Sequence, residues 1–286
     1  MWSCGPEKNN GVNGKENPPG VDLAANQEGQ GDVVKKDPPQ KSDELEEGKD
    51  FKHPTMHFEM VWVEPGNFFL GAKKNAPGQK GKTGILVTLT KGFWLAKYET
   101  TQEIYEAVMH DNPSDFPSPR HPVENLAYFE AEDFCNRLTA WEQENGRLPG
   151  SLRYHLPTEA QWEFAAKGGN NAHILTFPSL DESAWHKENS TGGPSNIGLK
   201  AAHPLGFHDL IGNVSELCYG RAAPYPVTAQ KDWIGPQDGN FCIARGGGWY
   251  STPAECAETT RMEVLPSFKM SMVGFRFAVS STMVVH

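Results

Sequence analysis

The residues best suited to chemistry lie in the segment from Gly206 to Glu216, which reads GFHDLIGNVSE. Two carboxylates, Asp209 and Glu216, flank a Gly-Asn turn signal in this segment. A hard cation such as calcium prefers several oxygen ligands from carboxylates, amides and main-chain carbonyls, and a bent segment can supply most of them. A tight turn between two strands, with both carboxylates in solvent, fits the same pattern. The spacing alone leaves both interpretations open.

The cysteines and histidines limit the other kinds of site. The chain has five cysteines, Cys4, Cys135, Cys218, Cys242 and Cys256, and no CxxC pair. This pattern excludes a zinc ribbon and a thioredoxin-type redox pair. The histidines show no His-x-x-x-His spacing, so a histidine-rich metal site is not expected. Cys135 falls on the buried face of an expected helix and is interpreted as a small core residue.

Composition indicates one sizeable core with many turns. The chain has 286 residues, a formal charge of −10 and 37% hydrophobic residues. Its 8 Trp, 29 Gly and 22 Pro are more typical of turns around an aromatic core than of a helical bundle. The acidic balance argues against a nucleic-acid partner. No apolar run approaches the length of about 18 residues that a transmembrane helix requires.

Residues 1–55 are expected to form a disordered polar tether, because residues 3–50 contain no aromatic side chain and alternate Pro, Gly, Asn and charge. The opening residues MWSCG are similar to the end of a bacterial lipoprotein signal peptide, in which a cysteine after a small residue becomes lipidated. The apolar region that should precede Cys4 is absent. Two interpretations therefore stay open: a lipid anchor at Cys4 behind a truncated start, or an ordinary thiol. A tether of this kind suits an exported lipoprotein in the periplasm or on the cell surface.

A compact domain is expected over residues 56–286. Short β-branched or aromatic runs predict strands, and helical spacing with capping motifs predicts three helices. The capping residues are expected to be Thr100 with Glu103 in the first helix and Thr158 with Gln161 in the third. After Gly169 the pattern predicts loops, turns and short strands, with an alternating strand at the end. The expected strands are 59–63, 67–71, 85–90, 92–98 and 273–279, and the expected helices are 100–110, 127–145 and 158–168.

Several stretches occur in a fixed order that is specific to one family. They are GFWLAKYETTQEIYEAVM, HPVENLAYFEAEDFCNRL, LPTEAQWEFAAKGG and GFHDLIGNVSE, followed by RGGGW and GFRFAV. The order and the residues of these stretches resemble the sulfatase-modifying factor family in its short bacterial form. The founding member of this family is the formylglycine-generating enzyme. The resemblance covers roughly residues 59–280. It implies an α+β fold: a single domain that is a variation on the C-type lectin fold, with little regular secondary structure.

The resemblance also implies a structural calcium site. In this sequence its ligands would be Asp209, the carbonyls of Gly212 and Val214, and Glu216. Calcium would then fix the loop that carries the binding face. Asn213 is expected to satisfy backbone groups rather than the ion.

Active formylglycine-generating enzymes hold copper(I) with two cysteines that follow the glycine-rich bend. Counted from Trp249, these positions are Ser251 and Cys256 in this sequence. Copper(I) is soft and suits two thiolates, and a serine hydroxyl, which stays protonated at neutral pH, cannot replace one. The copper pair is therefore expected to be degenerate. The sequence leaves open whether Cys242 or Cys218 completes a thiol pair with Cys256.

The serine in place of the first copper cysteine leaves two functions to consider. The favoured one is an exported, non-catalytic module that binds a peptide, protein or glycan ligand. The alternative is a divergent oxidase that converts a sulfatase cysteine to formylglycine with copper(I). Arg245, Trp249 and Arg276 are the expected substrate contacts, and the alternative for the two arginines is pairing with core carboxylates such as Glu159 or Glu163.

Overall fold

The computed structural model describes residues 45–71, 84–172 and 176–281, which all belong to one compact unit, Pro39–His286. Cys4 and the rest of the expected tether up to residue 44 lie outside the described residues. Among the helices that are described, none has the length and apolar character needed to span a bilayer.

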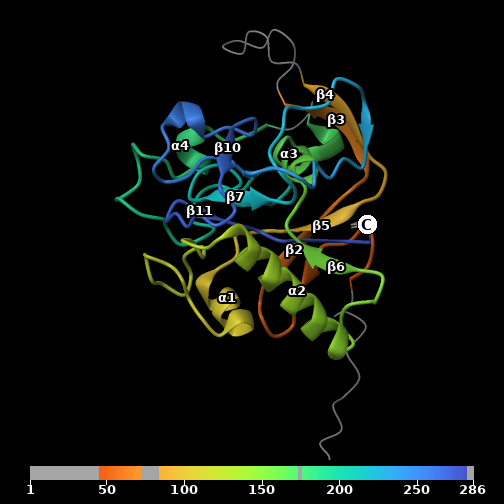
Figure 1. The fold of residues 1–286 in the computed structure, drawn as a ribbon. Helices are drawn as coiled ribbons and strands as arrows, with labels where there is room; N and C mark the ends of the chain where they lie inside the picture. Colours follow the sequence, from red (N-terminus) through yellow and green to blue (C-terminus); the bar gives the residue numbers. More distant parts are fainter. Residues whose placement is uncertain (1–44, 72–83, 173–175, 282–286) are drawn as a thin grey trace, which may run out of the picture. The chain divides into compact units, whose positions relative to one another are not determined.

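A five-stranded antiparallel sheet forms the centre of this unit (Figure 1). Its order is β1-β2-β5-β12-β6, so the last strand of the described residues lies between two strands from much earlier in the chain. The pairing of β12 with both β5 and β6 joins distant parts of the sequence. The strands are β1 (Phe51–Lys52), β2 (Glu59–Val63), β5 (Phe93–Ala96), β12 (Ala278–Ser280) and β6 (Arg153–His155).

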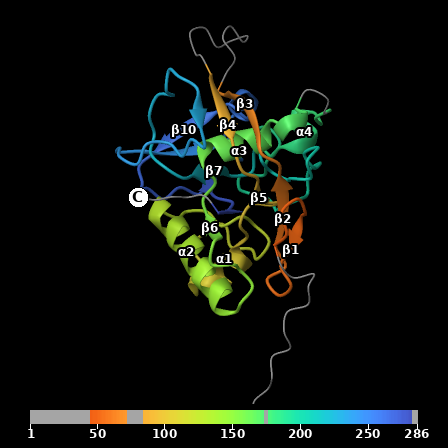
Figure 2. The same cartoon turned by 90° about the vertical axis from the view of Figure 1, so that its right-hand side faces the viewer.

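Both faces of this sheet are buried, which explains why β5 is apolar at every position. Successive side chains of a strand point to opposite faces. Trp94 of β5 packs in one core and Leu95 in the other. The first core contains α1 (Gln102–Met109) and α2 (Tyr128–Glu144), which lie together on one side of the sheet in Figures 1 and 2.

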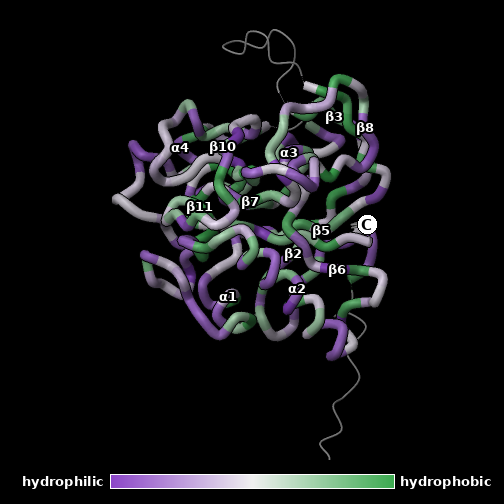
Figure 3. Tube along the Cα trace, in the orientation of Figure 1, coloured by the Kyte–Doolittle hydropathy of each residue, from purple (hydrophilic) through white to green (hydrophobic). Residues whose placement is uncertain are grey.

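The second core lies on the opposite side of the sheet, against α3 (Glu159–Ala166). Two smaller sheets flank these cores, and Figure 3 shows mostly hydrophobic residues along β5. One has the order β3-β4-β8 and the other β10-β9-β7-β11. Their strands are β3 (Gly66–Leu70), β4 (Ile85–Leu89), β8 (Gln230–Lys231), β10 (Arg261–Val264), β9 (Cys242–Arg245), β7 (Ser215–Cys218) and β11 (Val273–Gly274). Short helical turns are η1 (Gly169–Asn171), α4 (Leu180–Ser183) and η2 (Pro253–Glu255).

The α+β class is confirmed, and the predicted strands and helices occur with small shifts of their ends. Thr158 and Gln161 form the predicted capping box of α3. The first helix differs, because Thr101 rather than Thr100 caps α1 and accepts a hydrogen bond from the Ile104 amide. The short helix α4 was not expected from the sequence.

Two further expectations need correction. The predicted tether extended to residue 55, but Phe51 of β1 and His53 are buried in the domain. His53 is held there by Glu142, at 3.0 Å from Nε2 to the carboxylate. The predicted final strand is divided into β11 and β12, because Arg276 turns inward between them and residues 273–280 are all buried.

Candidate functional site

The glycine-rich bend after β9 lies directly against the 206–216 segment. Gly246 and Gly247 have φ values of 90° and 74°, which side-chain-bearing residues rarely adopt. A Cβ atom on Gly248 would lie only 3.1 Å from the Asn213 carbonyl oxygen. The Trp249 amide donates to that same carbonyl at 2.6 Å. The backbone of the bend therefore passes close to the candidate calcium segment.

Ser251 and Cys256 both lie beside Gly248. The Ser251 hydroxyl accepts a hydrogen bond from the Gly248 amide at 3.1 Å. Cys256 follows η2 and is buried, with Sγ 4.0 Å from the Gly248 carbonyl oxygen. Burial raises the pKa of the Cys256 thiol to about 11. At neutral pH this position therefore offers a protonated thiol beside a hydroxyl, not two thiolates.

The structure gives Cys218 and Cys242 partners of their own. Cys218 Sγ lies 3.7 Å from the Glu216 carbonyl oxygen, and Cys242 Sγ lies 3.1 Å from the Val264 carbonyl oxygen. Burial raises the pKa of both thiols. All four cysteines in the described part of the chain are free thiols. Within residues 45–71, 84–172 and 176–281, no group of three His, Cys, Asp or Glu residues is arranged to hold a metal ion.

Arg245 has the structural role that the sequence left as an alternative. It is fully buried at the end of β9 and forms ion pairs with Glu159 and Glu163 of α3. Its guanidinium also donates to the main-chain oxygen of Glu258 at 2.5 Å. Arg245 therefore has no exposed surface for a substrate, which differs from the expected substrate contact.

Arg276 is also internal, but its partner is Glu216. Its Nε and Nη2 atoms donate to the two carboxylate oxygens at 2.7 and 2.6 Å. The indole of Trp162 donates to Glu216 at 2.6 Å. Trp249 alone of the three expected contacts is partly exposed, and its ring packs edge to face with Phe116.

Three buried carboxylates surround this arginine. Besides Glu216 they are Asp209 and Glu99, and Glu99 accepts from the Val214 amide at 3.0 Å and from the Asn213 side chain at 2.6 Å. Burial, together with the charges of Asp209 and Glu216, raises the pKa of Glu99 well above its usual range. Burial also raises the pKa of Asp209 to about 6. Glu216 contacts the guanidinium directly, whereas Glu99 and Asp209 feel its charge, which opposes the rise of their pKa.

Asp209 has an unused oxygen. Its Oδ2 atom accepts from the Gly198 amide at 2.7 Å, whereas Oδ1 is buried without a hydrogen-bond partner among the described atoms. Asn213 bridges backbone groups as predicted, since its side chain accepts from the Ser195 amide and donates to the Ser195 carbonyl. Sequence reasoning missed Glu99, whose only signal was an acidic residue directly after an apolar strand.

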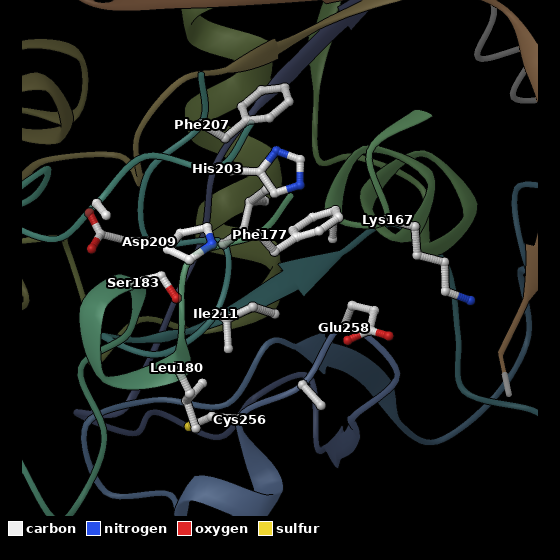
Figure 4. Close-up of a pocket in the computed structure, with 15 residues that line it drawn as sticks. Lys167, Phe177, Leu180, Ser183, His203, Phe207, Asp209, Ile211, Cys256 and Glu258 are labelled. Carbon is white, nitrogen blue, oxygen red and sulfur yellow. The ribbon is translucent and has the colours of Figure 1, made fainter. Parts of the chain in front are cut away.

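A pocket of about 370 Å³ links the two predicted sites, because Asp209 and Cys256 both line it (Figure 4). Its walls come from the end of α3, from α4, from the loop 201–211 and from the residues after η2. Most of the lining is apolar. Sequence reasoning also missed the pocket residues Phe177, His203 and Glu258, because they come from three loops without local periodicity.

Known proteins share this fold and these motifs. A family model described as sulfatase-modifying factor enzyme 1-like domain matches residues 47–281. The structure of Treponema denticola variable protein 1 is similar with a TM-score of 0.69 and 27% identity, over 80% of this chain and 98% of that one.

Curated relatives carry different names. The chaperone protein LppX of Paenibacillus barcinonensis is 29% identical over 69% of this chain and 81% of its own length. The serine/threonine-protein kinase pkn1 of Chlamydia pneumoniae is 30% identical over 77% of this chain and 38% of the kinase. The inactive Cα-formylglycine-generating enzyme 2 of Bos taurus is 27% identical over 55% of this chain, which spans half of that protein. With a family model that covers most of its length, the chain belongs to the sulfatase-modifying factor family.

Proposed function

We propose that this chain is a non-catalytic member of the family that binds a peptide, protein or glycan ligand. The observation that carries the proposal is the pair Ser251 and Cys256, a hydroxyl already bonded to the Gly248 amide and a buried thiol with a pKa of about 11. Copper(I) needs two soft thiolate ligands, and this pair can supply at most one, because a serine hydroxyl stays protonated at neutral pH. The presence of a relative named as inactive and another named as a chaperone supports the same function.

The experiment is a conversion assay with a cysteine-containing sulfatase-motif peptide, copper(I), a reductant and oxygen. Mass spectrometry of the peptide would report formylglycine. We expect no conversion by the wild-type protein. Ser251→Cys is the matched variant, because it places a second thiol at the pair and leaves the glycines of the bend in place. Conversion by the wild-type protein would contradict the proposal and support the oxidase.

Calcium is part of the proposal as a structural ion held by Asp209, the carbonyls of Gly212 and Val214, and Glu216. Two features support it: the unpartnered buried Oδ1 atom of Asp209, and three buried carboxylates with one arginine. Among the described residues, Oε1 of Glu216 accepts from Arg276 and keeps a further lone pair, whereas Oε2 accepts from both Arg276 and Trp162. The ion would balance charge and fix the segment that supports the glycine-rich bend.

Export with a lipid anchor at Cys4 completes the proposal, on the basis of the MWSCG opening and the polar composition that follows it. Metabolic labelling with radioactive palmitate tests it, with the protein produced from its own gene in its native host so that any natural leader is present. Labelling that disappears in Cys4→Ser is the expected result, and an unlabelled wild-type chain in the soluble fraction would contradict it.

A further inference from the structure

We infer that the pocket of Figure 4 binds an organic cation, an ammonium group carried on an apolar body. This inference rests on the proposed binding function and names a ligand class for it. The volume of about 370 Å³ lies within the range of small-molecule sites, roughly 300–1,000 Å³. Such sites combine apolar walls with a few well-placed polar groups.

Apolar side chains form most of the pocket lining. Phe207 and Leu210 are buried residues of this lining, and Ile211 and Leu180 also belong to it. Phe177 is 43% exposed and holds its ring against His203, with the ring centroids 5.0 Å apart. An exposed aromatic face of this kind attracts a cation through the quadrupole of the ring.

The only cationic residue of the lining cannot attract an anion. The three donors of the Lys167 ammonium are used by Glu163 and by the carbonyls of Phe69 and Gly71, at 2.5, 2.8 and 2.9 Å. Figure 4 shows its side chain leading away from the other labelled residues. Burial lowers the pKa of His203 to about 4, so this imidazole is neutral at pH 7. A ligand carboxylate would therefore meet no available positive charge.

Glu258 supplies the charge that recognises an ammonium. Glu258 lines the pocket, and its main-chain oxygen accepts from Arg245 at 2.5 Å. Figure 4 shows Glu258 and Asp209 on opposite sides of the pocket. Asp209 is assigned to the calcium site above and is not needed for this contact. Glu258 and Phe177 both line the pocket, and in this proposal they are the charged and the aromatic partner of the cationic group.

Calorimetric titration with three probes that share one body tests the inference: 2-phenylethylamine, 2-phenylethanol and phenylacetate. The amine is expected to bind about tenfold more tightly than the alcohol, and phenylacetate more weakly than both. Glu258→Gln should reduce the affinity for the amine to that for the alcohol. Glu263→Gln, the same change at an exposed position of β10 outside the pocket, should change nothing.

A second variant tests the location. Ala257→Phe places a large side chain in the lining and should weaken all three probes, with circular dichroism confirming that it folds. Equal affinity for amine and phenylacetate, or an amine affinity that neither Glu258→Gln nor Ala257→Phe changes, would overturn the inference. Weak binding of all three probes to the wild-type protein would also overturn it.

The ammonium group can belong to a small amine or to a lysine side chain of a peptide. Capped pentapeptides with a central lysine or norleucine distinguish these sources. A peptide-binding site should bind the lysine peptide more tightly than both the norleucine peptide and 2-phenylethylamine, whereas a site for small amines should bind 2-phenylethylamine more tightly. Failure of the inference is separate from failure of the proposed function. Formylglycine formation would overturn the function whatever the probes do, and loss of amine preference would overturn only the ligand class.

Discussion

The chemistry of Cys256 depends on its surroundings more than on its identity. A thiol reacts as the thiolate, and burial beside Gly248 keeps this one protonated. Buried arginines show the same dependence. Arg245 and Arg276 follow a family pattern that suggested substrate contacts, yet each is used to neutralise buried carboxylates. Residue type and spacing therefore did not show which contacts these two side chains make.

Native Cys256 should react slowly with iodoacetamide at pH 7.5. A pKa of about 11 in place of 9.0 leaves roughly a hundredfold less thiolate than in a free cysteine. Mass spectrometry of the Cys256 peptide measures the rate, which should rise steadily toward pH 10, and urea-unfolded protein serves as the control. Rapid labelling of the native protein at pH 7.5 would show that the thiol is activated.

Arg245→Met should lower the free energy of unfolding by about 3–5 kcal/mol, because Glu159 and Glu163 would lose their buried partner. Arg137→Met is the matched control, since the ion pair of Arg137 with Asp133 is exposed and its loss should cost less than about 1 kcal/mol. Urea unfolding of both variants gives the comparison. Equal effects would mean that the buried pairs contribute no more than a surface pair.

Glu124 should make stability depend on pH. Burial raises its pKa to about 7, so between its normal pKa of 4.5 and pH 7 the folded state binds more protons than the unfolded state. Stability from this group is therefore present at low pH and lost as the pH rises to 7, with a slope of at most about 1.4 kcal/mol per pH unit. Urea unfolding from pH 4.5 to 8 should show this slope in the wild type. The same slope in Glu124→Gln would assign it to another group.

Elements were predicted best where their signals are local. The capping box of α3 and the apolar face of α2 lie within one helix each, and both were identified. The position of β12 between β5 and β6 depends on contacts more than 100 residues apart, for which one sequence has no local signal. The pairs Arg276 with Glu216 and His53 with Glu142 join residues 60 and 89 positions apart and likewise have no local signal.

The segment 45–55 should behave as part of the domain. A chain that begins at Met56 loses the burial of Phe51 and the contact of His53 with Glu142, so its free energy of unfolding should fall by about 2–5 kcal/mol. A chain that begins at Leu45 is the control and should match the full-length protein. Urea unfolding compares the three. Equal stability of the shortest chain would mean that β1 contributes nothing.

At the scale of the whole molecule, the 206–216 segment connects the candidate sites. The Gly212 amide donates to the Gly246 carbonyl and the Trp249 amide to the Asn213 carbonyl, so the segment and the glycine-rich bend hold each other. Asp209 extends this connection to the pocket. The sequence motifs identified the 206–216 segment and the glycine-rich bend. The pocket is formed by the packing of loops, which have no periodic pattern of hydrophobic residues from which it could be predicted.

Calcium should stabilise the whole domain if the proposed site binds it. A ligand that binds only the folded state at 100 times its dissociation constant adds about 2.7 kcal/mol. Thermal unfolding in EDTA, magnesium and calcium measures this, and calcium alone should raise the midpoint. Asp209→Asn should reduce the calcium response. An unchanged midpoint in calcium would contradict the proposed ion.

The central claim is that this family member lacks a copper(I) bis-thiolate site. Competition with bicinchoninate measures it most directly, with reduced wild-type protein and Ser251→Cys titrated side by side. We predict that the wild type leaves copper(I) with the chelator. Only Ser251→Cys, which has cysteines at both 251 and 256, should take one equivalent of copper(I) from the chelator. Tight binding of one equivalent by the wild type, lost in Cys256→Ala, would contradict the account.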